Sequence, residues 1–207
     1  MFITFEGGEG TGKSTQVKLL AERLRAHGKD VVTTREPGGT PEAETLRNLL
    51  VSGNTARWTA DEELLLNFAA RGSHLRNVII PALKGNKVVI CDRFIDSSFV
   101  YQCVAGGARQ SLFTELVNAV ASDPTPNFTF ILDIDPLLAM TRAALRNGNQ
   151  SSNTRADRYE LKGSAFHQRV REGFTELAKH HPKRCHLVDA NGMPEEVASR
   201  IWVKFNG

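Results

Sequence analysis

The chain has 207 residues, 41% of them hydrophobic, and its 26 basic and 23 acidic side chains leave a net charge of +3. This length suits one domain spanning residues 1–207 with a sizeable core, and the charge balance argues against a nucleic-acid-binding or membrane-surface protein. No apolar run approaches the length of a membrane span.

The cysteine pattern indicates a reducing compartment. Cys91, Cys103 and Cys185 are odd in number and match no zinc-binding spacing, so we expect free, largely buried thiols. An apolar run begins already at Phe2, which leaves no room for a signal peptide. We therefore expect a cytoplasmic protein.

A phosphate-binding motif follows the first predicted strand. Residues 2–5 are an apolar run, residues 7–14 read GGEGTGKS, and a helical pattern then continues to Gly28. Strand, glycine-rich turn and helix predict a P-loop, in which Lys13 would reach the β- and γ-phosphates of a nucleotide and Ser14 would bind Mg²⁺. The residues expected to bind this nucleotide are Gly7, Gly8, Glu9, Gly10, Thr11, Gly12, Lys13, Ser14 and Thr15.

Glu9 is an unusual residue for such a loop, because its carboxylate would repel bound phosphates. Either it turns toward a sugar hydroxyl or a second substrate, or it is a solvated loop acid.

The second predicted strand, residues 31–34, ends in the sharp loop Arg-Glu-Pro-Gly-Gly-Thr at residues 35–40. Ligands of α/β proteins lie at such strand ends, so we expect Arg35 to contact phosphate. Thr40 is the expected N-cap of a helix that ends at Gly53. Arg47, on this helix, either contacts phosphate or is solvated.

A long helix is predicted over residues 59–83, with Thr59 and Glu62 as a capping box. Phe68 and Arg71 lie on one turn of it. This pair either reads a base by stacking and hydrogen bonding or is a core phenylalanine beside a half-buried arginine.

The third predicted strand, residues 87–91, runs directly into Asp92 and Arg93. An aspartate in this position of a P-loop protein usually orders Mg²⁺ or its waters, and Arg93 would then meet phosphate; the alternative is a structural ion pair. A helix over residues 94–102 would place four polar side chains on one face, toward a hydrogen-bonded small molecule. These four are Ser97, Ser98, Tyr101 and Gln102.

The rest of the chain continues the alternation of strands and helices. Five strands alternating with helices predict a parallel sheet covered on both faces, a three-layer α/β/α P-loop kinase fold. The remaining strands are expected at residues 128–132 and 185–188, and the remaining helices at residues 110–122, 136–146, 166–180 and 194–205.

Residues 147–154 are rich in Gly, Asn and Ser and are flanked by arginines. Such a segment, about residues 146–160, is typical of a lid that closes over phosphates, although a surface loop with solvated charges has the same composition. The flanking arginines are Arg142, Arg146, Arg155 and Arg158.

Four blocks together resemble the bacterial type of thymidylate kinase, over nearly the whole chain. They are FEGGEGTGKS at residues 5–14, TREPGGTPEAE at residues 34–44, DRF at residues 92–94 with the polar positions after it, and DRYE at residues 157–160. The second block is the most specific. The resemblance implies that ATP and dTMP, with Mg²⁺, give ADP and dTDP for dTTP synthesis, and that the protein is a homodimer.

The resemblance also implies roles for single residues. Glu9 would lie near the 3′-hydroxyl of dTMP, Arg93 would hold the acceptor phosphate, and Asp92 would hold the waters of Mg²⁺. Arg142 resembles the residue that stacks on adenine. Lys13 and Arg93 are the expected catalytic residues, together with Arg155 and Arg158 from the lid and with Arg146 behind them. Arg71 would hydrogen-bond thymine, Ser98 would contact its edge, Tyr101 would exclude a ribose 2′-hydroxyl, and Glu36, Pro37, Phe68 and Gln102 complete the implied dTMP site.

One departure keeps other functions open. The family usually has a base-stacking phenylalanine four residues before the thymine-binding arginine, where this chain has Asn67 and Phe68 follows. A kinase of the same fold for dUMP or another nucleotide is therefore the first alternative. A nucleotide-binding regulatory module without transfer chemistry is the second, although no N-K-x-D guanine motif is present.

Overall fold

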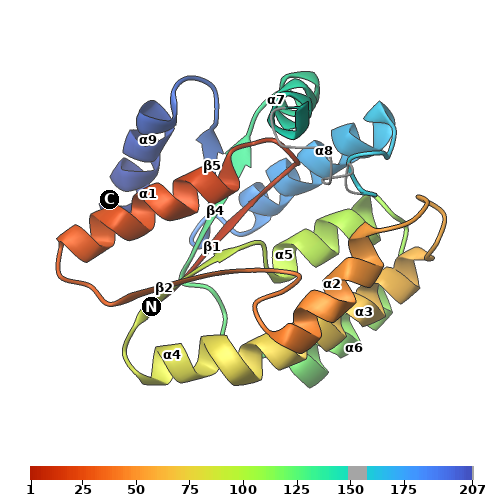
Figure 1. Cartoon of the computed structure of the whole chain (residues 1–207), viewed down its shortest axis with the longest axis horizontal. Helices are drawn as coiled ribbons and strands as arrows, with labels where there is room; N and C mark the ends of the chain where they lie inside the picture. Colours follow the sequence, from red (N-terminus) through yellow and green to blue (C-terminus); the bar gives the residue numbers. More distant parts are fainter. Residues whose placement is uncertain (149–157, 207) are drawn as a thin grey trace.

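The computed structural model describes residues 1–148 and 158–206, and of residues 146–148 it describes the backbone alone. Within these residues five parallel strands form one sheet in the order β2-β3-β1-β4-β5 (Figure 1). The strands are β1 (Phe2–Gly7), β2 (Val31–Arg35), β3 (Val88–Asp92), β4 (Phe128–Asp133) and β5 (Cys185–Asp189).

Helices connect consecutive strands, as a parallel sheet requires. The α-helices are α1 (Lys13–Ala26), α2 (Pro41–Val51), α3 (Ala60–His74), α4 (Ile80–Lys84), α5 (Ile95–Ser98), α6 (Gln110–Val120), α7 (Pro136–Gly148), α8 (Ser164–His180) and α9 (Pro194–Asn206), and two π-helical segments are η1 (Leu75–Ile79) and η2 (Phe99–Val104).

The two faces of the sheet carry separate parts of the core. Ile3 and Phe5 of β1 pack with α1 and α9 on one face, whereas Phe2 on the same strand belongs to the core against α3. Figure 1 shows α1 and α9 together on one side of the strands and α3, α4 and α5 on the other. The predicted three-layer α/β/α arrangement is confirmed.

The helix predicted over residues 59–83 forms, but not as one regular α-helix. Thr59 and Glu62 make both hydrogen bonds of the capping box, as expected. The segment then passes through α3, η1 and α4. The π-helical turn η1 comes directly before Pro81, which has no N–H to donate to the preceding turn.

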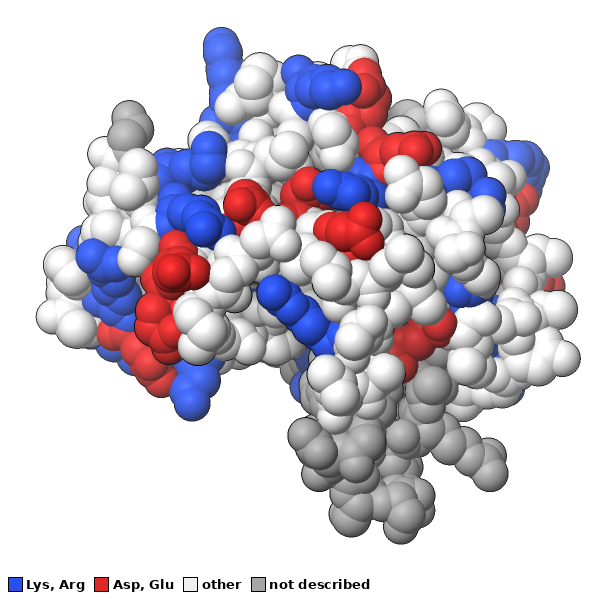
Figure 2. Space-filling model, turned by 90° about the horizontal axis from the view of Figure 1, so that it is seen from above, with Lys and Arg blue, Asp and Glu red and all other residues white. Residues whose placement is uncertain are grey.

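Charged side chains of both signs are interspersed over the face seen in Figure 2, in keeping with the small net charge. Among the helices of the described residues, none has both the length and the apolar composition needed to cross a bilayer.

Candidate active site

The loop between β1 and α1 has the geometry of a phosphate-binding loop. Gly10 adopts φ 70°, and a Cβ there would overlap the carbonyl oxygen of Ala139 on α7, so only glycine fits. Gly12 precedes α1 with no side-chain cap, so the first N–H groups of the helix are directed at the loop. A helix N-terminus of this kind attracts anions.

Lys13 folds back over this loop. Its Nζ donates to the carbonyl oxygens of Gly8 at 2.6 Å and Gly7 at 3.2 Å, and the side chain is buried. Burial, helped by the nearby Arg93 cation, lowers the pKa of Lys13 to about 8, although the carboxylates around it act in the opposite direction.

This pKa predicts that ATP binding takes up a proton. At pH 8 the free chain carries Lys13 about half protonated, and phosphates beside Nζ would restore its full charge, so uptake of about half a proton is expected. Calorimetric titration with ATP at pH 8, in two buffers of different ionisation enthalpy, measures this uptake. Lys13→Met is the control that should abolish it; equal heats in both buffers for the wild type would contradict the prediction.

Two oxygen ligands converge at the start of α1. The Ser14 hydroxyl donates to Oδ2 of Asp92, at the end of β3, over 2.6 Å. Mg²⁺ prefers oxygen ligands and is usually held by one or two protein groups together with substrate phosphates. Ser14 and Asp92 therefore fit the predicted metal site.

Arg93 lies between the P-loop and a second cavity. Its backbone has φ 68°, and its guanidinium donates to the Gly7 carbonyl at 2.9 Å, to Ser97 Oγ at 3.1 Å and to Glu9 Oε1 at 2.7 Å. The Tyr101 hydroxyl lies 3.1 Å from both Arg93 Nη2 and Glu9 Oε1. Glu9 thus turns toward Arg93 and Tyr101 and is not a solvated loop acid.

These neighbours keep the carboxylate of Glu9 ionised. Burial alone would raise the pKa of Glu9, but the Arg93 and Lys13 cations and the Tyr101 hydroxyl outweigh it and lower the pKa to about 2. Conversely, Glu9 and the other nearby anions raise the pKa of Arg93 against the effect of burial. Both groups are charged at any physiological pH.

The second cavity, hereafter the acceptor cavity, opens beside Arg93. Eight of the residues predicted to bind dTMP lie in its wall, together with Arg47, Asn67 and Ser97, which the sequence analysis also discussed, and with three others. It is lined by Glu9, Glu36, Pro37, Arg47, Val51, Asn67, Arg71, Arg93, Phe94, Ser97, Ser98, Tyr101, Gln102 and Tyr159.

Arg71 is held at this cavity by a buried ion pair. Its Nε donates to Glu36 at 2.8 Å and its Nη2 to Ser98 Oγ at 2.9 Å, and the side chain is 2% exposed. Nη1 has no hydrogen-bond partner among the described residues. His74, which sequence patterns did not identify, fixes the other oxygen of Glu36 at 3.0 Å. One buried donor of a residue that lines the cavity is therefore left without a partner within the part of the chain that the structure describes.

The structure corrects the expectation for Phe68. Its ring is buried in the core against Phe113 and does not line the acceptor cavity. Asn67 takes the place in the wall, because one residue along a helix turns a side chain by about 100°. Phe68 instead supports Arg71, whose guanidinium carbon lies 4.6 Å from the centre of the Phe68 ring.

The peptide bond between Glu36 and Pro37 is cis.

The two arginines around the 35–40 loop have different surroundings. Arg35 is exposed and pairs with both carboxylate oxygens of Glu44 at 2.9 Å, so the expected phosphate contact is not supported. Arg47 donates to the Pro37 carbonyl at 2.9 Å and lines the acceptor cavity.

The predicted lid lies largely outside the described residues, and Arg155 with it. Arg158 is described, and it corrects the expectation of a catalytic role. Its guanidinium is completely buried and donates to Glu63, to the Leu50 carbonyl and to the Thr55 carbonyl at 2.6, 2.8 and 3.2 Å. It has no route to a phosphate without breaking this buried ion pair.

Arg142, the expected adenine-stacking residue, is exposed on α7 and donates to the Ala190 carbonyl just after β5 at 3.1 Å. Helix α7 itself packs against the P-loop, because Ala139 lies against Gly10.

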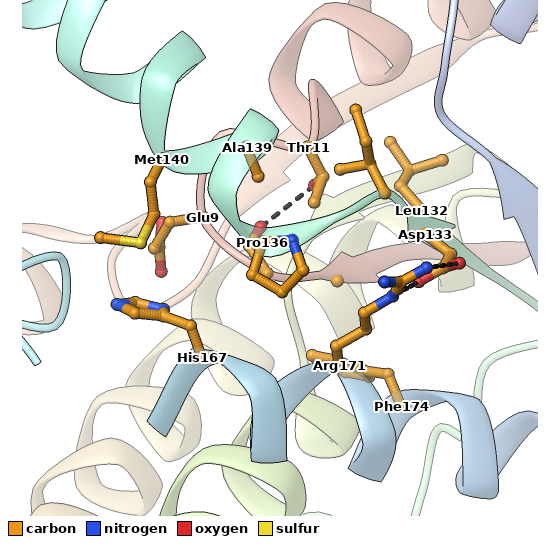
Figure 3. Close-up of a pocket in the computed structure, with 13 residues that line it drawn as sticks. Glu9, Thr11, Leu132, Asp133, Pro136, Ala139, Met140, His167, Arg171 and Phe174 are labelled. Atoms are coloured by element: carbon orange, nitrogen blue, oxygen red, sulfur yellow. Dashed lines mark hydrogen bonds and ion pairs between the residues drawn. The ribbon is translucent and has the colours of Figure 1, made fainter. Parts of the chain in front are cut away.

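A small cavity of about 20 Å³ lies beneath the P-loop (Figure 3). His167 of α8 points toward Glu9 in it, beside Met140 of α7, while Arg171 pairs with Asp133 at 2.7 Å on the other side. His167 is 5% exposed, and its Nε2 has no hydrogen-bond partner among the described residues. The sequence analysis assigned the histidines no role, because they show no metal-binding spacing.

Glu6 supports Arg93 from inside the sheet. This buried carboxylate of β1 accepts hydrogen bonds from the Phe94 N–H and the Ser97 hydroxyl. Burial, together with the negative charge of Asp96, raises the pKa of Glu6 against the effect of these bonds and of Arg93. The sequence does not reveal such a residue, because Thr4 and Glu6 alternate with Ile3 and Phe5 as on a half-exposed strand, whereas all of β1 is buried.

The site combines a P-loop with its lysine, a hydroxyl–carboxylate pair that could hold a metal ion, and an arginine that leads to a second cavity. These features define an ATP-dependent phosphotransferase with the P-loop kinase fold. The family model for thymidylate kinase matches residues 5–201. The thymidylate kinases of Caulobacter vibrioides and Jannaschia sp. are 46% and 44% identical to the chain over 97% of its length and 93% of theirs. A crystal structure of thymidylate kinase from Ehrlichia chaffeensis superposes with a TM-score of 0.76 and 38% identity, covering 100% of this chain and 98% of that one. The chain therefore belongs to the thymidylate kinase family.

Proposed function

We infer that the protein transfers the γ-phosphate of ATP to dTMP, giving ADP and dTDP. The observation that carries this inference is the position of Arg93, which touches the P-loop carbonyl of Gly7 and also lines the acceptor cavity. A cation at that point can hold an acceptor phosphate next to the nucleotide of the P-loop. Family membership supports dTMP as the acceptor.

The residues present account for transfer by positioning and charge neutralisation. Lys13 and Arg93 would neutralise charge on the transferring group from two sides. Ser14 and Asp92 would hold Mg²⁺, which neutralises phosphate charge when bound. No general base is needed, because the phosphate of the acceptor is itself the nucleophile. A lid arginine, Arg155, would complete the cluster.

Each polar group around the acceptor cavity has a proposed role in binding the acceptor nucleotide. The acceptor phosphate would replace Glu9 at Arg93 Nη2, which frees the Glu9 carboxylate for the sugar 3′-hydroxyl. Tyr101 would fill the space of a ribose 2′-hydroxyl. The unpaired Nη1 of Arg71, with Ser98 beside it, would bind the base.

Release of ADP with Mg²⁺ and ATP, measured over a panel of acceptors, tests this function. The panel contains dTMP, dUMP, dCMP, dGMP, UMP and thymidine, and strong preference for dTMP is the expected result. Preference for dUMP would favour the alternative that Asn67 raises, since Asn67 lines the cavity where an aromatic ring is usual. No acceptor-dependent release would contradict a kinase function and favour a regulatory module.

Three further properties stay predictions of the sequence and the family resemblance. They are a homodimeric state, a cytoplasmic location and the arrangement of residues 1–207 as one domain with a lid at about residues 146–160. Binding of Mg²⁺ and adenine contact by Arg142 are likewise proposed.

A further inference from the structure

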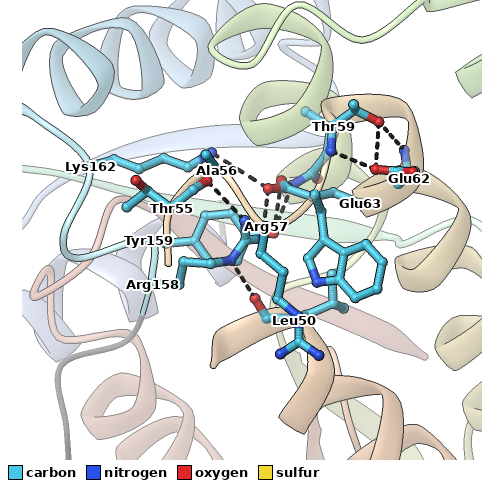
Figure 4. Close-up of polar contacts among 12 residues, drawn as sticks. Leu50, Thr55, Ala56, Arg57, Thr59, Glu62, Glu63, Arg158, Tyr159 and Lys162 are labelled. Carbon is cyan, nitrogen blue, oxygen red and sulfur yellow. Dashed lines mark hydrogen bonds and ion pairs between the residues drawn. The ribbon is translucent and has the colours of Figure 1, made fainter. Parts of the chain in front are cut away.

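A buried carboxylate on α3, Glu63, lies behind the wall of the acceptor cavity. It is 2% exposed and does not itself line the cavity. Its oxygens accept hydrogen bonds from Arg158 at 2.6 Å and from the Tyr159 hydroxyl at 2.9 Å, and Lys162 Nζ lies 3.6 Å away (Figure 4). Gln102 Nε2 also donates to the carboxylate at 2.9 Å. A buried charge persists only with such partners.

The partners of Glu63 are themselves wall residues of the cavity. Gln102 and Tyr159 line it, and so does Asn67, whose Nδ2 donates to the backbone carbonyl of Glu63 at 2.8 Å. The carboxylate of Glu63 therefore holds two side chains of the wall, from η2 and from the segment after residue 157, while its backbone carbonyl holds Asn67 on the same helix.

The carboxylate of Glu63 also decides the orientation of one amide. A carboxylate only accepts hydrogen bonds, so the NH₂ group of Gln102 must face Glu63. The oxygen of Gln102 is then the end turned away from it. Without this carboxylate, the amide of Gln102 could rotate and exchange an acceptor for a donor, whereas Asn67 keeps its bond to the backbone carbonyl in any variant of residue 63.

Arg158 extends this arrangement to α2. Besides Glu63, its guanidinium holds the Leu50 carbonyl, and its backbone N–H donates to the carbonyl of Val51 at 2.9 Å. Val51 lines the acceptor cavity as well. The buried ion pair thus ties the end of α2 to α3 on the two sides of one wall.

We propose that Glu63 and Arg158 act as one positioning pair that sets the shape and the hydrogen-bonding pattern of the acceptor cavity, and so the affinity for the acceptor nucleotide. The proposal rests on the function proposed for that cavity. Neither residue touches the P-loop, where Lys13 and Arg93 act on the phosphates. The pair therefore controls the KM of the acceptor and leaves kcat and the KM of ATP nearly unchanged.

Glu63→Gln is the main test, because it keeps the size of the side chain and removes its charge. The expected result is a rise of about 10- to 100-fold in the KM of the acceptor, because the wall side chains that the carboxylate holds lose a hydrogen-bond partner. The values of kcat and of the KM of ATP should change by less than about threefold. Steady-state kinetics with each substrate varied in turn give all three constants.

Two variants separate positioning from simple stability. Glu62→Gln is the matched control, because it makes the same change one residue away and weakens the helix cap while Glu62 has no partner in the cavity. Glu63→Gln combined with Arg158→Met removes both charges and should recover thermal stability, yet the KM of the acceptor should stay high because the amide of Gln102 remains free to rotate. Tyr159→Phe is a milder variant for use if Glu63→Gln does not fold, with an expected rise of a few-fold in the same KM.

Unchanged kinetic constants in Glu63→Gln with a lowered Tm would overturn the proposal, and so would a fall in kcat at constant acceptor KM. The KM is measured with the acceptor that the wild type prefers in the panel. A preference other than dTMP would thus refute the proposed substrate and still test Glu63. A wild type that uses no acceptor would overturn both proposals.

Discussion

Replacing Arg93 by methionine is expected to lower kcat/KM for dTMP by about 10²- to 10⁴-fold. The guanidinium is 14% exposed and joins the P-loop carbonyl of Gly7, Ser97 and Glu9 at one point between the two nucleotide sites. Truncating one partner of a buried, hydrogen-bonded charge pair costs about 3–5 kcal/mol of binding, and the same loss of contact with the acceptor phosphate in the transition state gives this fall in kcat/KM. The measurement is steady-state release of ADP with dTMP varied at saturating ATP and Mg²⁺.

Loss of stability must be separated from loss of function in this variant, because Glu9 would be left without its cation. Combining Arg93→Met with Glu9→Gln removes both charges, so Tm should recover while activity stays low. Arg93→Lys keeps the charge but not the fork of donors, and should be impaired less. A kcat/KM within threefold of the wild type in Arg93→Met would show that Arg93 does not hold the acceptor phosphate.

The fold was predictable from the sequence because its signals are local. Apolar runs bounded by glycine and proline mark the five strands, and the capping residues Thr40 and Thr59 make the predicted hydrogen bonds. The structure differs from the sequence prediction where local signals compete. The helix expected over residues 59–83 contains a π-helical turn before Pro81. Helix propensity alone does not show at which residues the backbone departs from α-helical geometry to accommodate a proline.

The candidate site was predictable where the chemistry is carried by neighbouring residues at fixed spacing. The P-loop and the pair Asp92 and Arg93 are of this kind, and the structure brings them together. Phe68 shows the limit, because base stacking depends on helix phase and one residue of phase moves the ring from the cavity into the core.

Buried ion pairs between distant segments that belong to no motif could not be predicted. Glu63 and Arg158 are 95 residues apart and His74 is 38 residues from Glu36, and each looks like an ordinary helix or loop charge in the sequence. Burial alone distinguishes them, and burial of a polar side chain has no sequence periodicity when its partner lies elsewhere. For this reason the sequence analysis groups Arg158 with the lid, although its side chain is buried against Leu50 of α2 and Glu63 of α3.

Replacing Arg155 by alanine is expected to lower kcat by about 10³- to 10⁵-fold, with little change in the KM of dTMP. Arg155 lies outside the described residues, so the prediction rests on its place in a polar segment beside a P-loop and on the absence of an arginine within residues 7–14. An arginine that meets the transferring phosphate only in the transition state contributes an effect of this size. Single-turnover measurement of phosphate transfer isolates the chemical step.

Arg158→Ala provides the contrast that makes this prediction sharp. Its buried guanidinium pairs with Glu63, so the alanine variant should lose stability and raise the KM of dTMP while transfer in the saturated complex remains within about tenfold. The two arginines therefore have opposite signatures, one in kcat and the other in KM. Arg155→Lys should recover part of the rate, because it restores the charge without the planar fork. A wild-type kcat in Arg155→Ala would exclude Arg155 as the catalytic arginine and leave Arg146 as the remaining candidate. A large fall of kcat in Arg158→Ala at unchanged KM would mean that the ion pair between Arg158 and Glu63 opens during the reaction.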